Sequence, residues 1–176
     1  MPCPSGPIIA HMPESNPQRI LLLHDQWATT QVLTACAQLP DEQFHRRFDI
    51  GLGSLHDTLT HIISVIRALT DTLAGAPPRP RLETDGQFRT PAQLQALLDE
   101  ASPAFAAEVN RCPLEQTVAR TTRDGKTLTL TRAAVLAHVT SHGTHHRAQC
   151  LNMLRRLSIS PLPPISVAEW TWLADQ

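Results

Sequence analysis

Apolar residues recur at intervals of three and four along four long stretches of the chain, which is the spacing of an amphipathic helix. The pattern predicts helices over about residues 15–38, 54–75, 90–110 and 132–157. Residues that cap helices stand at the starts of these stretches, while Pro40 and Gly75 mark the ends of the first two. We therefore expect a core built from four long helices.

Residues 116–131 follow a different pattern, because threonine and apolar residues alternate on both sides of Asp124-Gly125. Alternation with a period of two predicts strands, and Asp-Gly is a strong hairpin-turn signal. A short last helix is expected to begin at Ser166, where Glu169 completes a capping box. The predicted fold class is all-α: an antiparallel four-helix bundle with a small β-hairpin before the fourth helix and a short C-terminal helix.

The domain organisation is expected to be simple. Residues 1–14 contain four prolines and no periodic pattern, which predicts a flexible N-terminal arm. Residues 15–176 are expected to form a single domain, long enough to bury a core without disulfides or a structural metal. Two connections inside it, after Pro40 and over residues 76–91, are expected to be loops, and the second is a long proline-rich crossover.

Charge and cysteine spacing narrow the class of protein. The formal net charge is -1, so there is no overall basic field for nucleic acid or an anionic membrane, and neither is expected as a partner. No run of about 18 apolar residues is present. The four cysteines lie far apart in sequence, which favours free thiols in a reducing compartment. We expect a cytoplasmic protein.

Histidines give the strongest chemical signal. His142 and His146 are four residues apart, so on a helix they lie one turn apart on the same face, which also carries Val135 and Met153. Two inward imidazoles need polar partners, and a divalent ion of the zinc type would satisfy both. Hydrogen bonds to the backbone or to Gln149 are the alternative.

The residues around this pair are expected to differ in their surroundings. His138 and His145 fall at the edge of the apolar stripe, and Arg147 is expected to face outward or across to a neighbouring helix. Cys150 is either a ligand, a nucleophile or, as is more common, a buried inert thiol.

A third ligand has to come from another helix. His61 flanks the apolar stripe of the second helix beside small residues that leave room for an ion. His56 lies equally far from the stripe on the other side, but in the first turn, where a solvated side chain is expected. His24 is interpreted as an interface histidine with one ring nitrogen in water, and a role as fourth ligand or as partner of a ligand stays open.

Three sequence blocks resemble the DinB/YfiT-like family of metal-binding four-helix bundles over about residues 15–160. They are SLHDTLTHI at 54–62, HVTSHGTHHRAQ at 138–149, and Trp27-Ala28 followed by LPDEQF at 39–44. The resemblance implies that His61, His142 and His146 form a facial triad on a divalent ion. It also implies a homodimer, because bundles of this family often pair through helices.

The resemblance implies a metal-dependent enzyme acting on a small molecule, either a hydrolase or an S-transferase that uses a low-molecular-weight thiol. Zinc is the first expectation for the ion, with nickel, iron or manganese as alternatives. Arg147 is a candidate for holding substrate carboxylates, while Glu108 and Asp57 are candidate general bases. The alternative function is a non-catalytic metal- or ligand-binding stress-response protein.

Overall fold

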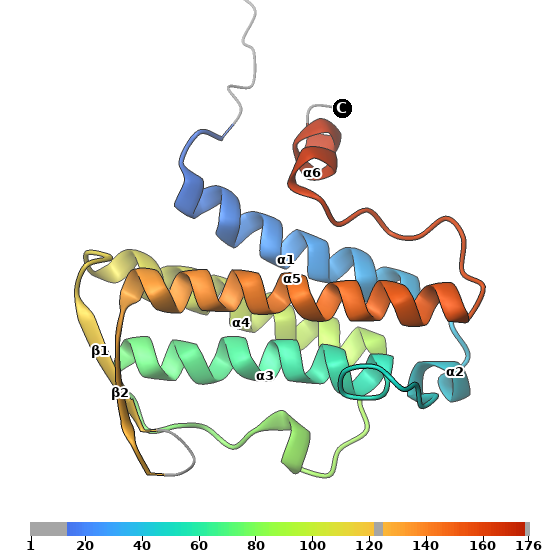
Figure 1. The fold of residues 1–176 in the computed structure, drawn as a ribbon, viewed down its shortest axis with the longest axis horizontal. Helices are drawn as coiled ribbons and strands as arrows, with labels where there is room; N and C mark the ends of the chain where they lie inside the picture. The colour runs from blue at the N-terminus through green and yellow to red at the C-terminus, as the bar shows by residue number, and fades with distance from the viewer. Residues whose placement is uncertain (1–13, 122–124, 175–176) are drawn as a thin grey trace, which may run out of the picture.

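Four long helices pack side by side in the computed structural model, which describes residues 14–121 and 125–174 (Figure 1). They are α1 (Pro17–Cys36), α3 (Leu55–Ala74), α4 (Pro91–Arg111) and α5 (Arg132–Arg156). All four predicted helices are confirmed within a few residues. The expected N-terminal arm lies almost wholly outside the described residues.

Helix starts are fixed by the capping residues that the sequence displays. The side chains of Asn16, Ser54 and Thr131 accept hydrogen bonds from backbone N–H groups in the first turns of α1, α3 and α5. Thr90 and Gln93 form a reciprocal capping box at α4. Each cap satisfies donors that a helix start leaves without an intrahelical partner.

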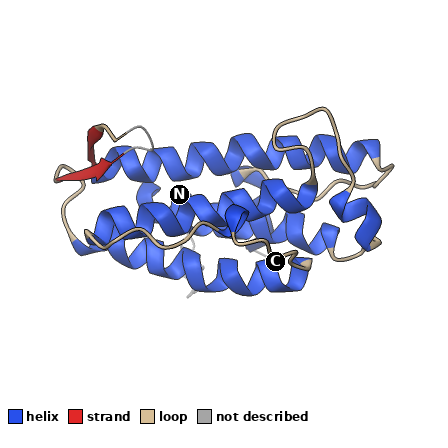
Figure 2. Cartoon of the chain, turned by 90° about the horizontal axis from the view of Figure 1, so that it is seen from below, coloured by secondary structure: helices blue, strands red, loops and turns tan. Residues whose placement is uncertain are grey.

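α3 packs against α5 and runs in the opposite direction. α1 packs against α4, also in the opposite direction (Figure 1). α3 and α4 run parallel, so the crossover between them returns along the length of the bundle before α4 begins (Figures 1 and 2). The apolar faces of all four helices meet in one core. Its fully buried side chains include Leu33, Leu59, Ile63, Leu98 and Met153.

The hairpin and the last helix are also confirmed. β1 (Thr117–Thr121) pairs with β2 (Thr127–Thr131) in antiparallel register. Of the expected turn, Asp124 lies outside the described residues, and Gly125 has the positive φ that the hairpin needs. α6 (Val167–Ala174) begins after Ser166, whose N–H and hydroxyl both donate to Glu169.

Two single-turn elements were expected to be loop. α2 (Asp41–His45) follows Pro40 and is anchored by the buried ring of Phe44, while η1 (Leu82–Thr84) lies within the crossover and buries Leu82. One turn of helix is too short to show a periodic pattern, so only packing against the bundle defines these elements. No helix in the described ranges combines the length and apolar character needed to cross a membrane.

A buried ion pair joins α1 to α5. Arg147 is 1% exposed, and its guanidinium donates to the Asp25 carboxylate at 2.6 Å and to the Thr29 hydroxyl at 3.0 Å. The expectation that Arg147 faces outward is wrong, and the alternative, that it faces a neighbouring helix, is confirmed. Gly143 makes room for this pair, because a Cβ there would lie 2.5 Å from Asp25 Oδ1.

Replacing Arg147 with methionine is expected to lower the free energy of unfolding by about 3 to 5 kcal/mol, since Asp25 would stay buried without its partner. Urea denaturation followed by circular dichroism measures the change. Arg19→Met is the matched control, because Arg19 pairs with Glu14 at the surface with 68% of its side chain exposed, and less than about 1 kcal/mol is expected. Equal losses in both variants would contradict the structural role of the buried pair.

Candidate metal centre

His61, His142 and His146 converge where α3 passes α5. The Nε2 atoms of His61 and His142 are 3.1 Å apart, and one nitrogen from each of the three rings lies within 4.8 Å of the others. α3 supplies the first ligand and α5 the other two, one helical turn apart. The described residues contain no other cluster of three histidine, cysteine or acidic side chains with this geometry.

The remote nitrogens of two rings are held by hydrogen bonds. His61 Nδ1 donates to Glu83 Oε1 at 2.8 Å, and His146 Nδ1 donates to Gln149 Oε1 at 2.8 Å. An ionised carboxylate only accepts, so the proton of neutral His61 resides on Nδ1 and the Nε2 lone pair points toward the other rings. This is how proteins orient histidines that bind a metal.

Burial keeps the α5 pair neutral. Desolvation, and after it the neighbouring His146, His61, His138 and His145, together lower the pKa of His142 to about 3. Burial also lowers the pKa of His146, although the hydrogen bond with Gln149 opposes the shift. Neutral imidazole is the form that donates a lone pair to a metal, so neither ring has to lose a proton at neutral pH.

These donors fit a divalent transition metal. Tetrahedral ligands about 2.0 to 2.1 Å from an ion lie roughly 3.4 Å from one another. The 3.1 Å separation of His61 and His142 is close to this value, and all three ligand atoms lie within 4.8 Å of one another. Three histidines leave a coordination position open for water or a substrate.

Glu83 contacts the histidine cluster, and the sequence did not reveal it. It lies on η1 in the crossover, 22 residues after the histidine that it contacts. Burial alone would raise the pKa of its carboxyl group, but hydrogen bonds from His61 and Ser64 and the nearby charge of Arg81 hold it at about 2. Only the path of the crossover, which no periodic pattern describes, brings Glu83 to His61.

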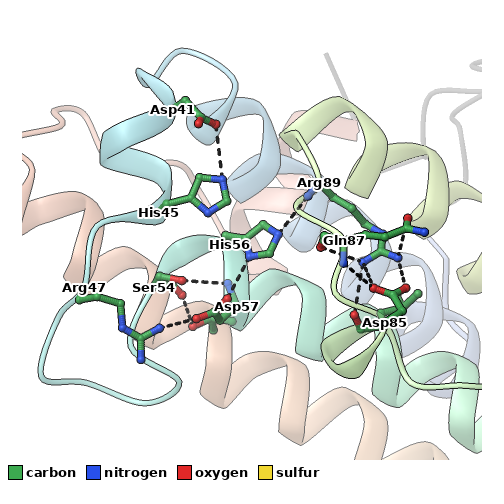
Figure 3. Close-up of polar contacts among 11 residues, drawn as sticks. Asp41, His45, Arg47, Ser54, His56, Asp57, Asp85, Gln87 and Arg89 are labelled. Carbon is green, nitrogen blue, oxygen red and sulfur yellow. Dashed lines mark hydrogen bonds and ion pairs between the residues drawn. The ribbon is translucent and has the colours of Figure 1, made fainter.

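His56 fixes that path, and the expectation that it is solvated is wrong. It is 5% exposed; its Nδ1 donates to Asp57 at 2.9 Å, and its Nε2 accepts the backbone N–H of Arg89 at 3.1 Å (Figure 3). Arg89 in turn binds Asp85 and the carbonyl oxygen of Leu82. Residues 82–89 are thereby folded onto α3, with Glu83 facing His61.

Gln149, the hydrogen-bond partner of His146, is held in place by close packing against Gly51. Gly51 has φ +53° and packs so closely on Gln149 that a Cβ would overlap the side-chain amide. The Gln149 Nε2 group donates to His145 Nε2 at 3.0 Å, which fixes the amide oxygen toward His146. From the sequence, Gln149 was the alternative hydrogen-bond partner of His142 and His146. The structure contains its hydrogen bond with His146.

Two further candidates lie outside the cluster. His24 is buried on α1, its Nε2 donates to the carbonyl oxygen of Ile165 at 2.9 Å, and its ring contacts Trp170. It is therefore neither a ligand nor exposed to water through that nitrogen, and it secures the segment before α6. Cys150 is fully buried, and desolvation raises the pKa of its thiol to about 12.

The charged side chains proposed for catalysis are all engaged elsewhere. Arg147 is buried against α1 and cannot hold a substrate carboxylate. The Asp57 carboxylate is bound by Arg47 and His56, and its backbone N–H donates to the Ser54 hydroxyl (Figure 3). Glu108 pairs with Arg111. Burial would raise the pKa of Asp57, but the hydrogen bonds from His56 and Ser54 hold it below its usual value.

The comparisons with known proteins agree with this architecture. The model of the DinB family matches residues 12–164. Among solved structures, the chain is similar to a DinB-like protein from Bacillus cereus ATCC 10987, with 16% sequence identity, 82% of this chain and 92% of that chain covered, and a TM-score of 0.62. At that identity the likeness concerns the fold. No curated protein matches the chain.

Glu83→Ala is expected to weaken zinc binding about 10- to 100-fold, because His61 loses the acceptor that fixes its proton and ring orientation. Competition with a chromophoric chelator measures the affinity. Glu42→Ala, which removes an exposed carboxylate on α2, is the control and should change nothing. An unchanged affinity in Glu83→Ala would show that the carboxylate does not support the ligand.

Cys36 and Cys150 are expected to resist dithionitrobenzoate at pH 8 in the folded protein. Burial raises both thiol pKa values, that of Cys150 to about 12, so almost no thiolate is present, and both side chains are inaccessible. Peptide mass spectrometry should find them labelled only after denaturation, whereas the partly exposed Cys112 serves as the internal control. Rapid native labelling of Cys150 would instead support a role as a nucleophile.

Proposed function

The chain belongs to the DinB family, and we propose that it binds a divalent transition metal through His61, His142 and His146 and acts on a small molecule at that ion. Zinc is proposed first, because three imidazoles with an open position are typical of catalytic zinc. Nickel, iron and manganese are the alternatives. When bound, such an ion would supply Lewis acidity at its open coordination position.

One observation carries this proposal. Rings from two helices turn their nitrogens toward one point, while Glu83 and Gln149 hold the far nitrogens of His61 and His146. Without an ion, these nitrogens are joined by the hydrogen bond between His61 Nε2 and His142 Nε2 at 3.1 Å. A cation bound at that point would satisfy one nitrogen from each of the three rings at once.

Among the two reactions, thiol-dependent transfer is better supported than hydrolysis. Attack by water needs a general base. The carboxylate nearest to the triad among the described residues, Glu83, accepts from His61 and Ser64 and pairs with Arg81, and its pKa is about 2. A thiol that coordinates such an ion would lose its proton to solvent on binding and be held as the thiolate, so its attack would not need such a base. We therefore propose an S-transferase that uses a low-molecular-weight thiol.

Elemental analysis tests the metal site. Wild-type protein purified with zinc in the medium should hold about one ion per chain, and His142→Ala should lose most of it, because two ligands hold zinc far more weakly than three. His138→Ala is the matched control: this histidine is exposed, one turn away on the same helix and outside the cluster. Equal metal content in all three proteins would overturn the site.

The reaction is tested with the metal-loaded protein. Glutathione, bacillithiol and mycothiol are each offered with a panel of electrophiles, and loss of the free thiol is followed. Turnover that disappears in His142→Ala supports the transferase. Turnover of esters or amides without any thiol would favour the hydrolase. Stoichiometric metal with no turnover in either panel would favour the non-catalytic alternative, a metal- or ligand-binding stress-response protein.

Two broader expectations remain predictions. The prediction of a homodimer rests on the family resemblance, and sedimentation equilibrium measures the oligomeric state directly. The prediction of a cytoplasmic location rests on the wide spacing of the four cysteines, which favours free thiols in a reducing compartment.

A further inference from the structure

A pocket with an apolar rim lies on the surface of α3 beside the candidate metal centre. Its volume is about 360 Å³, and it is bordered by the first turns of α3, the loop before that helix and residues 82–88 of the crossover. Thr60 and Leu82 are its most buried apolar-faced wall residues, at 2% and 6% exposure. A cavity of about 150 Å³ is large enough for benzene, so this pocket has room for two fused rings.

Two large apolar side chains at the rim are left in water. Phe88 of the crossover is 82% exposed, and Leu52 of the loop before α3 is 37% exposed. They reach the pocket from two different segments of the chain, so a ligand in the pocket would contact both. Covering this apolar surface would stabilise the bound ligand.

The wall is aromatic on the side of the crossover. The ring centroid of Phe88 lies 6.0 Å from that of His56 and 5.6 Å from that of His45. The rings of His45 and His56 are themselves 4.5 Å apart (Figure 3). Aromatic rings attract one another through edge-to-face and offset contacts, in addition to the burial of their area. This wall therefore favours an aromatic ligand over a saturated one of similar size.

Both carboxylates in the wall are already paired. Asp57 binds Arg47 and His56, and Glu83 accepts a hydrogen bond from His61. A cationic ligand would have to compete with these partners, and an anionic ligand would meet two groups of its own charge. A neutral group meets neither cost.

The crossover joins the pocket to the histidine triad. Glu83 lines the pocket, and its Oε1 accepts from His61 Nδ1 at 2.8 Å. Asp57, also in the wall, lies one helical turn before His61 on the same face of α3, about 6 Å along the axis. A molecule held at the triad therefore has to extend by about one helical turn to enter the pocket.

We propose that this pocket binds a neutral aromatic group of the substrate, with Phe88 and His56 as its ring contacts and Leu52 covering it from the other segment. The inference rests on the proposed function and names the substrate class of that site. An occupied pocket would also hold residues 82–88 against α3 and keep Glu83 at His61. The aromatic group and the metal should therefore strengthen each other's binding by the same factor.

The test compares 2-acetylnaphthalene with 2-acetyldecalin, its saturated analogue. Both are neutral and have the same number of non-hydrogen atoms. Equilibrium dialysis against the zinc-loaded full chain measures the two affinities. The naphthalene compound should bind about fivefold more tightly, because it alone gains the ring contacts.

Phe88→Leu should remove most of that preference, since it deletes the ring and keeps an apolar side chain. The native side chain is exposed, so the variant should fold, and circular dichroism checks this. Trp172→Leu is the matched control, because it deletes a ring that is 63% exposed on α6 and outside the pocket. That variant should keep the full preference, and its loss there would place the compound on α6 and contradict the proposal.

The metal-free chain gives a second readout. Zinc-loaded protein should bind 2-acetylnaphthalene about fivefold more tightly than metal-free protein, because each ligand stabilises the same conformation of residues 82–88. Glu83→Ala should abolish this difference, since the contact between the pocket wall and His61 is then lost.

Equal affinities of the two compounds for the wild type would overturn the proposal, as would a preference that survives in Phe88→Leu. Equal affinities of the naphthalene compound with and without zinc would show that the pocket is not part of the substrate site. A chain that binds no zinc would overturn the proposed function and this role of the pocket with it. The ring preference of the metal-free chain would then show separately whether the pocket itself selects aromatic groups.

Discussion

The rotation of α5 about its own axis is the constraint on which the candidate site depends. Gly143 and Arg147 each follow a site histidine by one residue, so the two pairs face about 100° apart around the helix. The ion pair of Arg147 with Asp25 holds one face against α1, and Gly143 lets the helices approach closely enough to form it. With that face fixed, His142 and His146 turn toward α3. A buried, hydrogen-bonded pair tolerates little rotation, because either charge would lose its partner.

The crossover between α3 and α4 completes the site. Because these two helices are parallel, their connection has to return along the bundle, and on the way it passes the face of α3 that carries His61. His56 and Arg89 fold residues 82–89 into one conformation, which brings Glu83 to the histidine. A rigid bundle therefore positions the ligands, and a surface connection supplies the group that orients one of them, as loops on stable scaffolds commonly do.

Charge is distributed unevenly around the three histidines. His142 and His146 are neutral because burial lowers their pKa values, and the carboxylate behind His61 is anionic because three donors surround it. A cation at the centre would be stabilised by these surroundings.

The sequence by itself determined the helices and the ligand pair, because both depend on local rules. Apolar spacing and capping residues such as Ser54 and Thr90 set the helix bounds, and the four-residue interval put His142 and His146 on one face. For the third ligand, periodicity left His61 and His56 equal. The small residues beside His61 and the first-turn position of His56 favoured His61, and the family resemblance strengthened that choice.

The tertiary structure separated those two histidines and revealed what surrounds them. His56 faces the crossover and His61 faces α5, a difference that depends on where α5 and residues 82–89 pack and not on the pattern within α3. The contacts of Glu83 and Arg147 join residues far apart in the chain. Long-range contacts leave no periodic signal, so the site's outer groups became visible only once the helices and the crossover were placed together.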